Sequence, residues 1–396
     1  MQGIKHLPRD LNIKGKRIIT RLDLNVPLKD KIIQDFTRIE QVLTFLQNLI
    51  ERKAKVILIS HLGRPKGIRD NTLSLLPIYK YIKKKLNTNM YFYTGEINDE
   101  LKTKSAYLKE GEILLIENIR FFREETENDE QFSKKLGELG DIYINNAFSC
   151  SHRKHSSIHS ITKFVKEIYA GPLLEKEISA INLIIKNKKD PVTCIIGGSK
   201  ISTKIGVISN LIKSTNNIII VGAMANNFLA YKKNEIGKSL KEDSSENTVR
   251  KILQEAEENK CRIIIPVDCL VSKSFGGEAV SKNIKSVEKD DIILDIGPNT
   301  IKIIEEVIDN SNTVMWNGPA GYFENKNFAL GTNAIAKRVS ENTKNRSLIS
   351  VLGGGDTVSA ITNSGLVLSF THLSTAGGAF LEYLEGKDLP GLSVLK

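Results

Sequence analysis

The chain has 396 residues, of which 40% are hydrophobic and 26% charged, and a formal net charge of +11. This length exceeds what one hydrophobic core usually supports, so we expect two compact domains of about 150 to 200 residues each, and the composition excludes a disordered chain. No stretch approaches the roughly 18 apolar residues that span a bilayer, and the N-terminus lacks the apolar centre of a signal peptide. We therefore expect a cytoplasmic protein with no membrane partner.

The positive charge favours anionic partners without choosing among them. Much of the excess is lysine in segments such as KYIKKKLN, rather than arginine interleaved with aromatic residues, and this pattern disfavours nucleic acid. The four cysteines form no C-x-x-C pair, which indicates reduced thiols rather than disulfides or a zinc site.

Short apolar runs alternate with amphipathic stretches along the whole chain. Buried strands are predicted within residues 16–24, 54–63, 112–121 and 141–148 of the first half. The second half repeats the alternation, with strands predicted within 192–199, 217–224, 262–270, 312–319 and 347–357. Strands that alternate with helices indicate parallel sheets covered on both faces. The predicted fold is α/β, with two Rossmann-like three-layer domains joined by a linker helix.

The linker is the segment between the two halves. Pro172 suits the first turn of a helix, helical spacing of apolar residues follows, and Pro191 ends the pattern. We predict a helix over residues 172–190, which separates an N-terminal domain (1–171) from a second domain (191–379). Residues 380–396 follow the second domain.

Cationic residues gather where the first-half strands end, which is where open parallel sheets bind ligands. The polar residues at or near these positions are Arg21, Asp23, Asn25, Arg38, His61, Arg64, Arg120, His152 and Arg153. Several convergent arginines with a histidine suit a small, multiply anionic ligand, although any one of them taken singly also fits a solvated surface residue. The run His152, His155 and His159 has metal-ligand spacing, but Arg153 and Lys154 within it favour an anion.

Glycines follow two strands of the second half. In IIGGSKISTKIG they let a phosphate approach the backbone, and we expect Lys200 and Lys204 on one helix face near its N-terminus. In LGGGDTV, Asp356 stands where a carboxylate beside phosphates predicts Mg²⁺. Neither a Walker A motif nor G-x-G-x-x-G is present, which disfavours P-loop kinases and simple dehydrogenases. For an isolated GGSK, glycines that only turn a strand into a helix remain the alternative.

An ordered set of motifs extends the pattern over both halves. The first half contains RLDLNVP, DFTRI, SHLGRPKG, ENIRFFREE and INNAFSCSHRKHSS, and the second GGSKISTKI, IPVDCLV, LDIGPNTI, WNGPAGYFE, GGGDTV and STAGGAFLEYLEGKDLPG. In these motifs the chain resembles the phosphoglycerate kinases. The resemblance implies reversible transfer of the acyl phosphoryl group of 1,3-bisphosphoglycerate to ADP, giving 3-phosphoglycerate and ATP, as in glycolysis and gluconeogenesis. It also implies direct in-line transfer after hinge closure, Mg²⁺ as cofactor, a monomer, and a tail (380–396) packed on the first domain.

The resemblance also assigns roles to individual residues. Phosphoglycerate is expected at Asp23, Asn25, Arg38, His61, Arg64, Arg120 and Arg153. The nucleotide is expected at Lys200, Lys204, Asn317, Glu324, Gly354, Gly355, Asp356 and Thr357, with Glu324 at the ribose and Mg²⁺ on Asp356. Arg38, Lys200, Gly377 and Gly378 are expected to act on the transferred phosphoryl group.

Five positions depart from the family pattern. They are Phe122 in place of His, Asn146 and Thr203 in place of Asp, Asn227 in place of Thr, and Ala376 in place of Gly. Thr203 lies between the two lysines, so a shifted nucleotide affinity is expected. Two rival hypotheses are a degenerate relative that binds nucleotide without catalysis and a basic protein whose partner is nucleic acid. The presence of Arg38, Lys200 and Asp356 disfavours the first.

Overall fold

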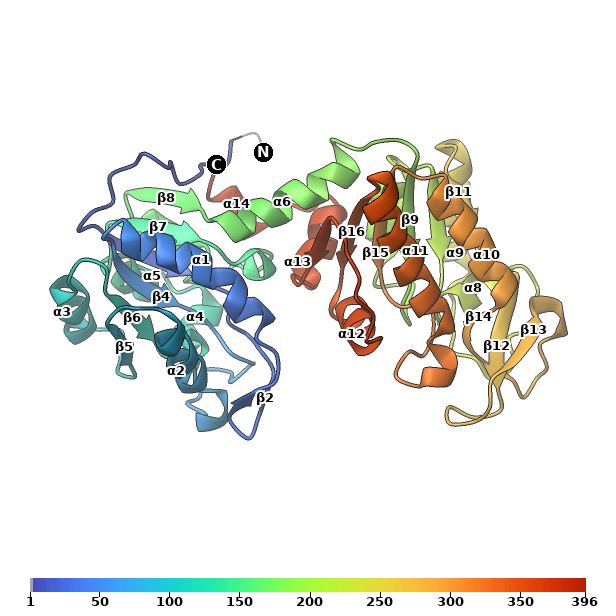
Figure 1. The fold of residues 1–396 in the computed structure, drawn as a ribbon, viewed down its shortest axis with the longest axis horizontal. Coiled ribbons are helices and arrows are strands. Elements are labelled where there is room, and N and C mark those ends of the chain that lie inside the picture. The colour runs from blue at the N-terminus through green and yellow to red at the C-terminus, as the bar shows by residue number, and fades with distance from the viewer. Residues whose placement is uncertain (1–2) are drawn as a thin grey trace. The chain divides into compact units, whose positions relative to one another are not determined.

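The computed structural model describes residues 3–396, which form two compact units (Figure 1). The first contains the residues up to Ile178 together with Asp388–Lys396, and the second contains Ser179–Lys387. Helix α6 (Pro172–Ile185) begins in one unit and ends in the other, five residues before the predicted end at 190. No helix within the described residues is both long and apolar enough to cross a membrane.

The first unit is built on a six-stranded sheet whose pairings are all parallel. A two-stranded hairpin, β2 (Leu28–Lys29) and β3 (Ile32–Ile33), stands apart from it. In spatial order the six strands are β5 (Met90–Tyr93), β6 (Ile113–Ile116), β4 (Lys55–Ile59), β1 (Arg17–Arg21), β7 (Ile142–Asn145) and β8 (Glu167–Ala170).

Alternating side chains of these strands bury both faces of the sheet. Ile18 and Val56 face one side, where they pack with α1 (Thr37–Glu51) and α2 (Leu76–Lys85). Ile19 and Ile57 face the other, where they pack with α3 (Asp99–Tyr107) and α5 (Glu130–Gly137). The short helix α4 (Arg123–Glu127) precedes α5. Sheets buried on both faces need apolar residues at every position, which explains the continuous apolar runs in the sequence.

The second unit repeats this plan with a second parallel six-stranded sheet. Its strands in spatial order are β11 (Arg262–Ile264), β10 (Asn217–Ile220), β9 (Val192–Ile196), β15 (Thr313–Asn317), β16 (Ile349–Gly353) and β17 (His372–Ser374). Its helices are α7 (Ile205–Ile212), α8 (Ala225–Tyr231), α9 (Glu246–Glu258), α10 (Pro298–Asp309), α11 (Leu330–Arg346), α12 (Gly355–Asn363) and α13 (Gly378–Leu384). The predicted α/β class with two parallel-sheet domains is confirmed.

One predicted strand is wrong. The run 262–270 is not a single strand, because it ends in the parallel sheet at Ile264 and resumes at Asp268 in a separate antiparallel sheet. That sheet contains β13 (Val280–Asn283), β12 (Asp268–Ser272) and β14 (Ile292–Ile296). Pro266 explains the break, since proline cannot donate a ladder hydrogen bond.

The C-terminal segment 388–396 packs on the first unit. Its helix α14 (Pro390–Ser393) approaches so closely that a Cβ on Gly391 would lie 2.9 Å from Ser151 Cα. The Gly391 amide donates to the Ser151 carbonyl at 2.8 Å, and Lys5 N donates to Leu395 O at 3.0 Å. The unit boundary at Lys387 and Asp388 lies later than the predicted start of the tail at 380. Helix α13 stays with the second unit, where Asn210 Nδ2 donates to Leu384 O at 2.6 Å.

We expect Leu395→Ala to destabilise the first unit by about 2–5 kcal/mol, because the side chain is fully buried and its removal leaves a cavity. Amide hydrogen exchange, read by mass spectrometry over each unit, should show faster exchange in residues 3–178 than in 179–387. Ser393→Ala is the matched control, since Ser393 is exposed on the same segment. Equal acceleration in both units would contradict the prediction.

Candidate active site

Strand order brings the predicted acid-site residues to one edge of the first sheet. Strands β6, β4, β1 and β7 are neighbours in the sheet. Arg120 follows β6, His61 and Arg64 follow β4, Asp23 and Asn25 follow β1, and Arg153 follows β7. Arg38 lies in the first turn of α1. Parallel strands place these ends on the same edge, so residues far apart in sequence meet there.

Direct contacts link the loops after β1 and β4. Arg38 Nη1 forms an ion pair with Asp23 Oδ2 at 2.8 Å and donates to Asn25 O at 2.9 Å. Asn25 Oδ1 accepts from Gly63 N at 2.8 Å, while Arg120 Nη1 donates to Gly63 O at 2.7 Å. Gly63 has φ +61°, a conformation that side chains disfavour, and a Cβ there would lie 2.8 Å from Leu73. Gly63 thus binds Asn25 through its N–H group and Arg120 through its carbonyl.

Arg120 is the least compensated charge of this cluster. Its side chain is 4% exposed, and its Nε and Nη2 atoms are buried without a hydrogen-bond partner among the described residues. The pKa of Arg120 is lowered to about 10, mainly by burial and also by Arg153 and Arg21, whereas Cys150 and Glu125 oppose this. A buried guanidinium with two unused donor nitrogens is an anion-binding group.

His61 lies within the field of the arginines. Burial is the main cause that lowers the pKa of His61 well below its usual value, and Arg21, Arg120, Arg153 and Arg38 lower it further. Arg21 Nη2 lies 3.2 Å from His61 Nδ1. The ring is therefore neutral, and a neutral imidazole can donate one hydrogen bond without adding charge.

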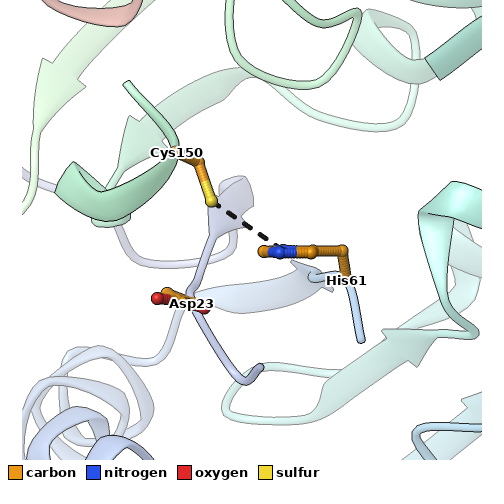
Figure 2. Close-up of side chains that lie close together, drawn as sticks. All are labelled: Asp23, His61 and Cys150. Carbon is orange, nitrogen blue, oxygen red and sulfur yellow. Dashed lines mark hydrogen bonds between the residues drawn. The ribbon is translucent and has the colours of Figure 1, made fainter. Parts of the chain in front are cut away.

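Cys150 completes a close group with His61 and Asp23 (Figure 2). Cys150 Sγ lies 3.8 Å from His61 Nδ1, and burial raises the pKa of the thiol. Ser149 Oγ donates to Asp23 Oδ2. Thiol, imidazole and carboxylate groups can all bind metals. Here, however, Arg38 pairs with the Asp23 carboxylate and Arg21 faces the His61 imidazole, so the group favours an anion over a cation.

The segment after β7 contributes Arg153 and two histidines. Arg153 Nε donates to His152 Nε2 at 3.2 Å. Burial lowers the pKa of His152 to about 4 and that of His155 to about 3, and neighbouring arginines contribute. Arg64, beyond His61 on the β4 loop, is exposed. The structure thus brings His61, Arg38, Arg120 and Arg153 together, with Arg64 at the solvent side.

In the second unit, Asn317 connects two of the predicted phosphate loops. Strands β9, β15 and β16 are neighbours, and Asn317 ends the middle one. Its Oδ1 accepts from Lys204 Nζ at 2.5 Å, and its Nδ2 donates to Gly353 O at 2.7 Å. Lys204 Nζ also donates to Gly197 O at 2.7 Å. Asn317 is 2% exposed, so in this structure it positions Lys204.

Lys200 and Lys204 do not share a helix face, and this prediction was wrong. Helix α7 begins only at Ile205, so both lysines precede it, Lys200 in irregular structure and Lys204 in a turn. Thr203 Oγ1 donates to Lys200 O at 2.9 Å within this turn, which offers its residues an alternative to helix. Lys200 is exposed and Lys204 is half-buried.

The loop after β16 forms a helix N-terminus. Gly354 has φ +106°, and a Cβ on it would lie 2.7 Å from Asn317 Nδ2. Thr357 Oγ1 accepts from Gly318 N at 2.7 Å, and this contact joins the loop to the end of β15. Asp356, in the first turn of α12, is exposed. Gly377, with φ +56°, directly precedes α13, and Gly378 begins it.

A cavity of about 280 Å³ lies beside these loops. Glycines and apolar side chains line much of it, Asp356 and Glu324 contribute carboxylates, and Phe275 and Tyr322 form an edge-to-face pair with ring centroids 5.6 Å apart. An apolar cavity with a few polar groups suits a flat organic ligand that bears phosphates.

No role was predicted for two residues that the structure places in these sites. Arg21, predicted only to lie at a strand end, is fully buried beside His61. Asp295 lines the cavity, and burial raises its pKa to about 7 against three opposing backbone donors. The sequence feature that could have pointed to Asp295 is its position as an acidic residue within the apolar run LDIGP.

The departures from the family pattern have ordinary structural partners. Asn146 Oδ1 accepts from Leu173 N at 2.8 Å and so caps α6. Asn227 Oδ1 accepts from Glu242 N at 2.9 Å. Phe122 packs on Phe132 with ring centroids 5.4 Å apart.

Comparison with known proteins covers nearly the whole chain. A family model described as phosphoglycerate kinase matches residues 8–387. Relatives named phosphoglycerate kinase include one from Wolbachia pipientis, 42% identical over 97% of both chains, and one from Dictyoglomus turgidum, 43% identical over 98% of this chain and 97% of the relative. The phosphoglycerate kinase structure from Coxiella burnetii is similar with a TM-score of 0.89 and 38% sequence identity. The match covers 98% of this chain and 97% of the Coxiella burnetii chain.

Lys204 generates a pH prediction. Burial lowers its pKa to about 8, and Asp356 partly opposes this. A phosphate ligand favours the charged amine and raises the pKa, so above about pH 8 binding must take up a proton and affinity should fall, approaching tenfold per pH unit. Calorimetric titration with ADP from about pH 7 to about pH 9.5 measures this slope.

Lys204→Arg is the matched variant, because arginine stays charged over this range and should flatten the slope. Lys302→Arg, at an exposed position on α10, should leave it unchanged. A parent affinity that does not vary over the range would contradict the prediction.

Proposed function

Because the chain belongs to the phosphoglycerate kinase family, it is a phosphotransferase, and we propose that the two sites described above hold its two substrates. The reaction is the reversible transfer of the acyl phosphoryl group of 1,3-bisphosphoglycerate to ADP, which gives 3-phosphoglycerate and ATP. We assign the acid to the first domain, predicted as 1–171 with the tail 380–396, and the nucleotide to the second, predicted as 191–379.

The unpaired donors of Arg120 are the observation that carries the acid assignment. Two buried guanidinium nitrogens with no hydrogen-bond partner within residues 3–396 destabilise the protein, and a carboxylate or phosphate ligand removes this cost. Asp23, Asn25, Arg38, His61, Arg64 and Arg153 surround the same edge and complete the proposed contacts. Among these residues the cations outnumber the carboxylate of Asp23, which matches a ligand with several negative charges.

The cavity of the second unit carries the nucleotide assignment. We assign the base to its apolar part, Glu324 to the ribose, and Lys200, Lys204, Gly354, Gly355 and Thr357 to the phosphates. Asn317 acts by holding Lys204. Backbone amides at the start of α12 favour phosphate oxygens through the helix dipole.

Asp356 fits a hard divalent cation. Its carboxylate is exposed at the cavity, beside the loops assigned to the phosphates, and oxygen is the ligand that Mg²⁺ prefers. When bound there with the nucleotide, Mg²⁺ supplies neutralisation of phosphate charge. Gly377 and Gly378 offer backbone amides at the start of α13, and we assign them to the transferred group.

Transfer needs positioning and charge neutralisation rather than a protein nucleophile. A terminal oxygen of ADP attacks the acyl phosphorus in line, and the bond from phosphorus to the carboxyl oxygen breaks, so 3-phosphoglycerate leaves as the carboxylate. Arg38, Lys200 and the glycine amides stabilise the charge on the equatorial oxygens. Since the acid and the nucleotide bind to different units, hinge closure must bring them together and exclude water. Action as a cytoplasmic monomer belongs to the same proposal.

We expect purified protein to phosphorylate 3-phosphoglycerate with ATP and Mg²⁺ in a coupled assay. Arg38→Ala should reduce kcat by about 100- to 1,000-fold, because a group that stabilises the transition state is removed. Asp356→Ala should raise the Mg²⁺ concentration needed for activity. Arg250→Ala and Asp388→Ala, both at exposed positions, are the matched controls. Nucleotide binding without activity in the parent would support the degenerate relative instead.

Closure has its own test. Small-angle X-ray scattering should show a smaller radius of gyration with 3-phosphoglycerate and a non-hydrolysable ATP analogue together than with either alone. The free protein and each single-ligand sample are the controls. An unchanged radius with both ligands bound would count against closure.

A further inference from the structure

A chain of buried hydrogen bonds extends behind the acid site. Glu125, fully buried on α4, accepts from Ser157 Oγ through Oε1 at 2.7 Å and from Ser157 N through Oε2 at 2.8 Å. The same hydroxyl accepts from Arg21 Nε at 2.8 Å. Arg21 Nη1 donates to Leu22 O, and Nη2 points to His61 Nδ1 at 3.2 Å. Each link joins residues at least 32 positions apart, except the contact with Leu22.

The chain decides which nitrogen of His61 carries a proton. A guanidinium is always a donor, so a nitrogen that faces it at hydrogen-bond distance must accept. His61 Nδ1 therefore holds its lone pair toward Arg21, and the proton of the neutral ring lies on Nε2. A second proton, on Nδ1, would place the N–H group of His61 directly against an N–H group of Arg21, and the two would repel each other.

We propose that Arg21 is a positioning residue for the acid site, which keeps His61 neutral with its proton on Nε2, while Ser157 and Glu125 fix the guanidinium. The proposal rests on the proposed function for one point only, that His61 contacts the acid substrate. In that role the Nε2–H group donates to an anionic oxygen. The other tautomer would present a lone pair to the anion and repel it.

The remaining groups around His61 fit this assignment. Arg120, Arg153 and Arg38 also oppose a charged ring, and burial keeps Cys150 a thiol. Asp23, the carboxylate grouped with His61, is paired with Arg38. Burial has the largest influence on the pKa of Glu125 and raises it, while Arg21 and Ser157 lower it. The Glu125 carboxylate and the Arg21 guanidinium therefore stabilise each other.

Nitrogen-15 NMR tests the tautomer without requiring activity. The protein has six histidines, and long-range proton–nitrogen correlation on histidine-labelled protein distinguishes their tautomers, with His61→Gln assigning the signal. We expect an Nε2-protonated, uncharged ring at neutral pH. A signal from the Nδ1-protonated or doubly protonated ring in the parent would overturn the proposal.

Ser157→Ala tests the chain, and Ser156→Ala is its matched control. Both serines are fully buried neighbours, but Ser156 Oγ donates to Glu124 O at 2.7 Å and lies outside the chain. Ser157→Ala should admit the other tautomer and raise the KM for 3-phosphoglycerate about three- to tenfold, as expected for one lost hydrogen bond, with the KM for ATP unchanged. Ser156→Ala should match the parent in both readouts.

Arg21→Lys is the second variant, because lysine keeps the charge but cannot bond the serine, the carbonyl and the imidazole together. It should also change the His61 signal. Equal signals in Arg21→Lys, Ser157→Ala and the parent would overturn the proposal. A parent without kinase activity would contradict the proposed function, and the spectra would still decide the tautomer.

Discussion

The burial of arginine at the carboxyl edge of the first sheet is the constraint that organises this protein. Moving a cation out of water costs several kcal/mol unless acceptors surround it. For Arg21 these acceptors are Ser157 and the Leu22 carbonyl, and for Arg120 the Gly63 carbonyl. The Leu22 and Gly63 carbonyls come from the loops after β1 and β4, with left-handed backbone at Gly63, and Ser157 comes from the segment after β7. The protein supplies enough acceptors to fold and leaves two donors of Arg120 for a ligand.

The proposed phosphate site of the second unit differs from this arrangement. It contains glycines, helix starts and one amide side chain, and its half-buried cation, Lys204, donates to neutral oxygens of Gly197 and Asn317. Burial is the main cause that lowers the pKa of Lys204 to about 8, and Asp356 opposes it only in part. The proposed acid site therefore keeps a fixed charge, whereas the proposed nucleotide site contains one that a ligand can strengthen.

The sequence predicts the parallel sheets because both of their faces are buried, which turns each strand into an unbroken apolar run. It also predicts residues that lie directly after such runs, such as His61 and Asn317, since topology alone places them at the edge. It does not predict Glu125 or Ser157, which act through contacts across many positions and belong to no strand end. The start of α7 was misplaced because lysine and serine fit a helix as well as a turn. The motif resemblance named the family correctly, and the roles of individual residues stay predictions.

The position of residues 388–396 has a consequence for how the protein is made. The second unit is one continuous segment, Ser179–Lys387, inserted into the chain of the first. During synthesis the ribosome delivers nearly all of the first unit early, but residues 388–396 only after the whole second unit. The usual order, in which the N-terminal domain finishes folding first, is therefore reversed: the inserted unit is complete in sequence before its host. Until residues 388–396 have been synthesised, the first unit lacks the hydrogen bonds that Gly391 makes with Ser151 and Asn145.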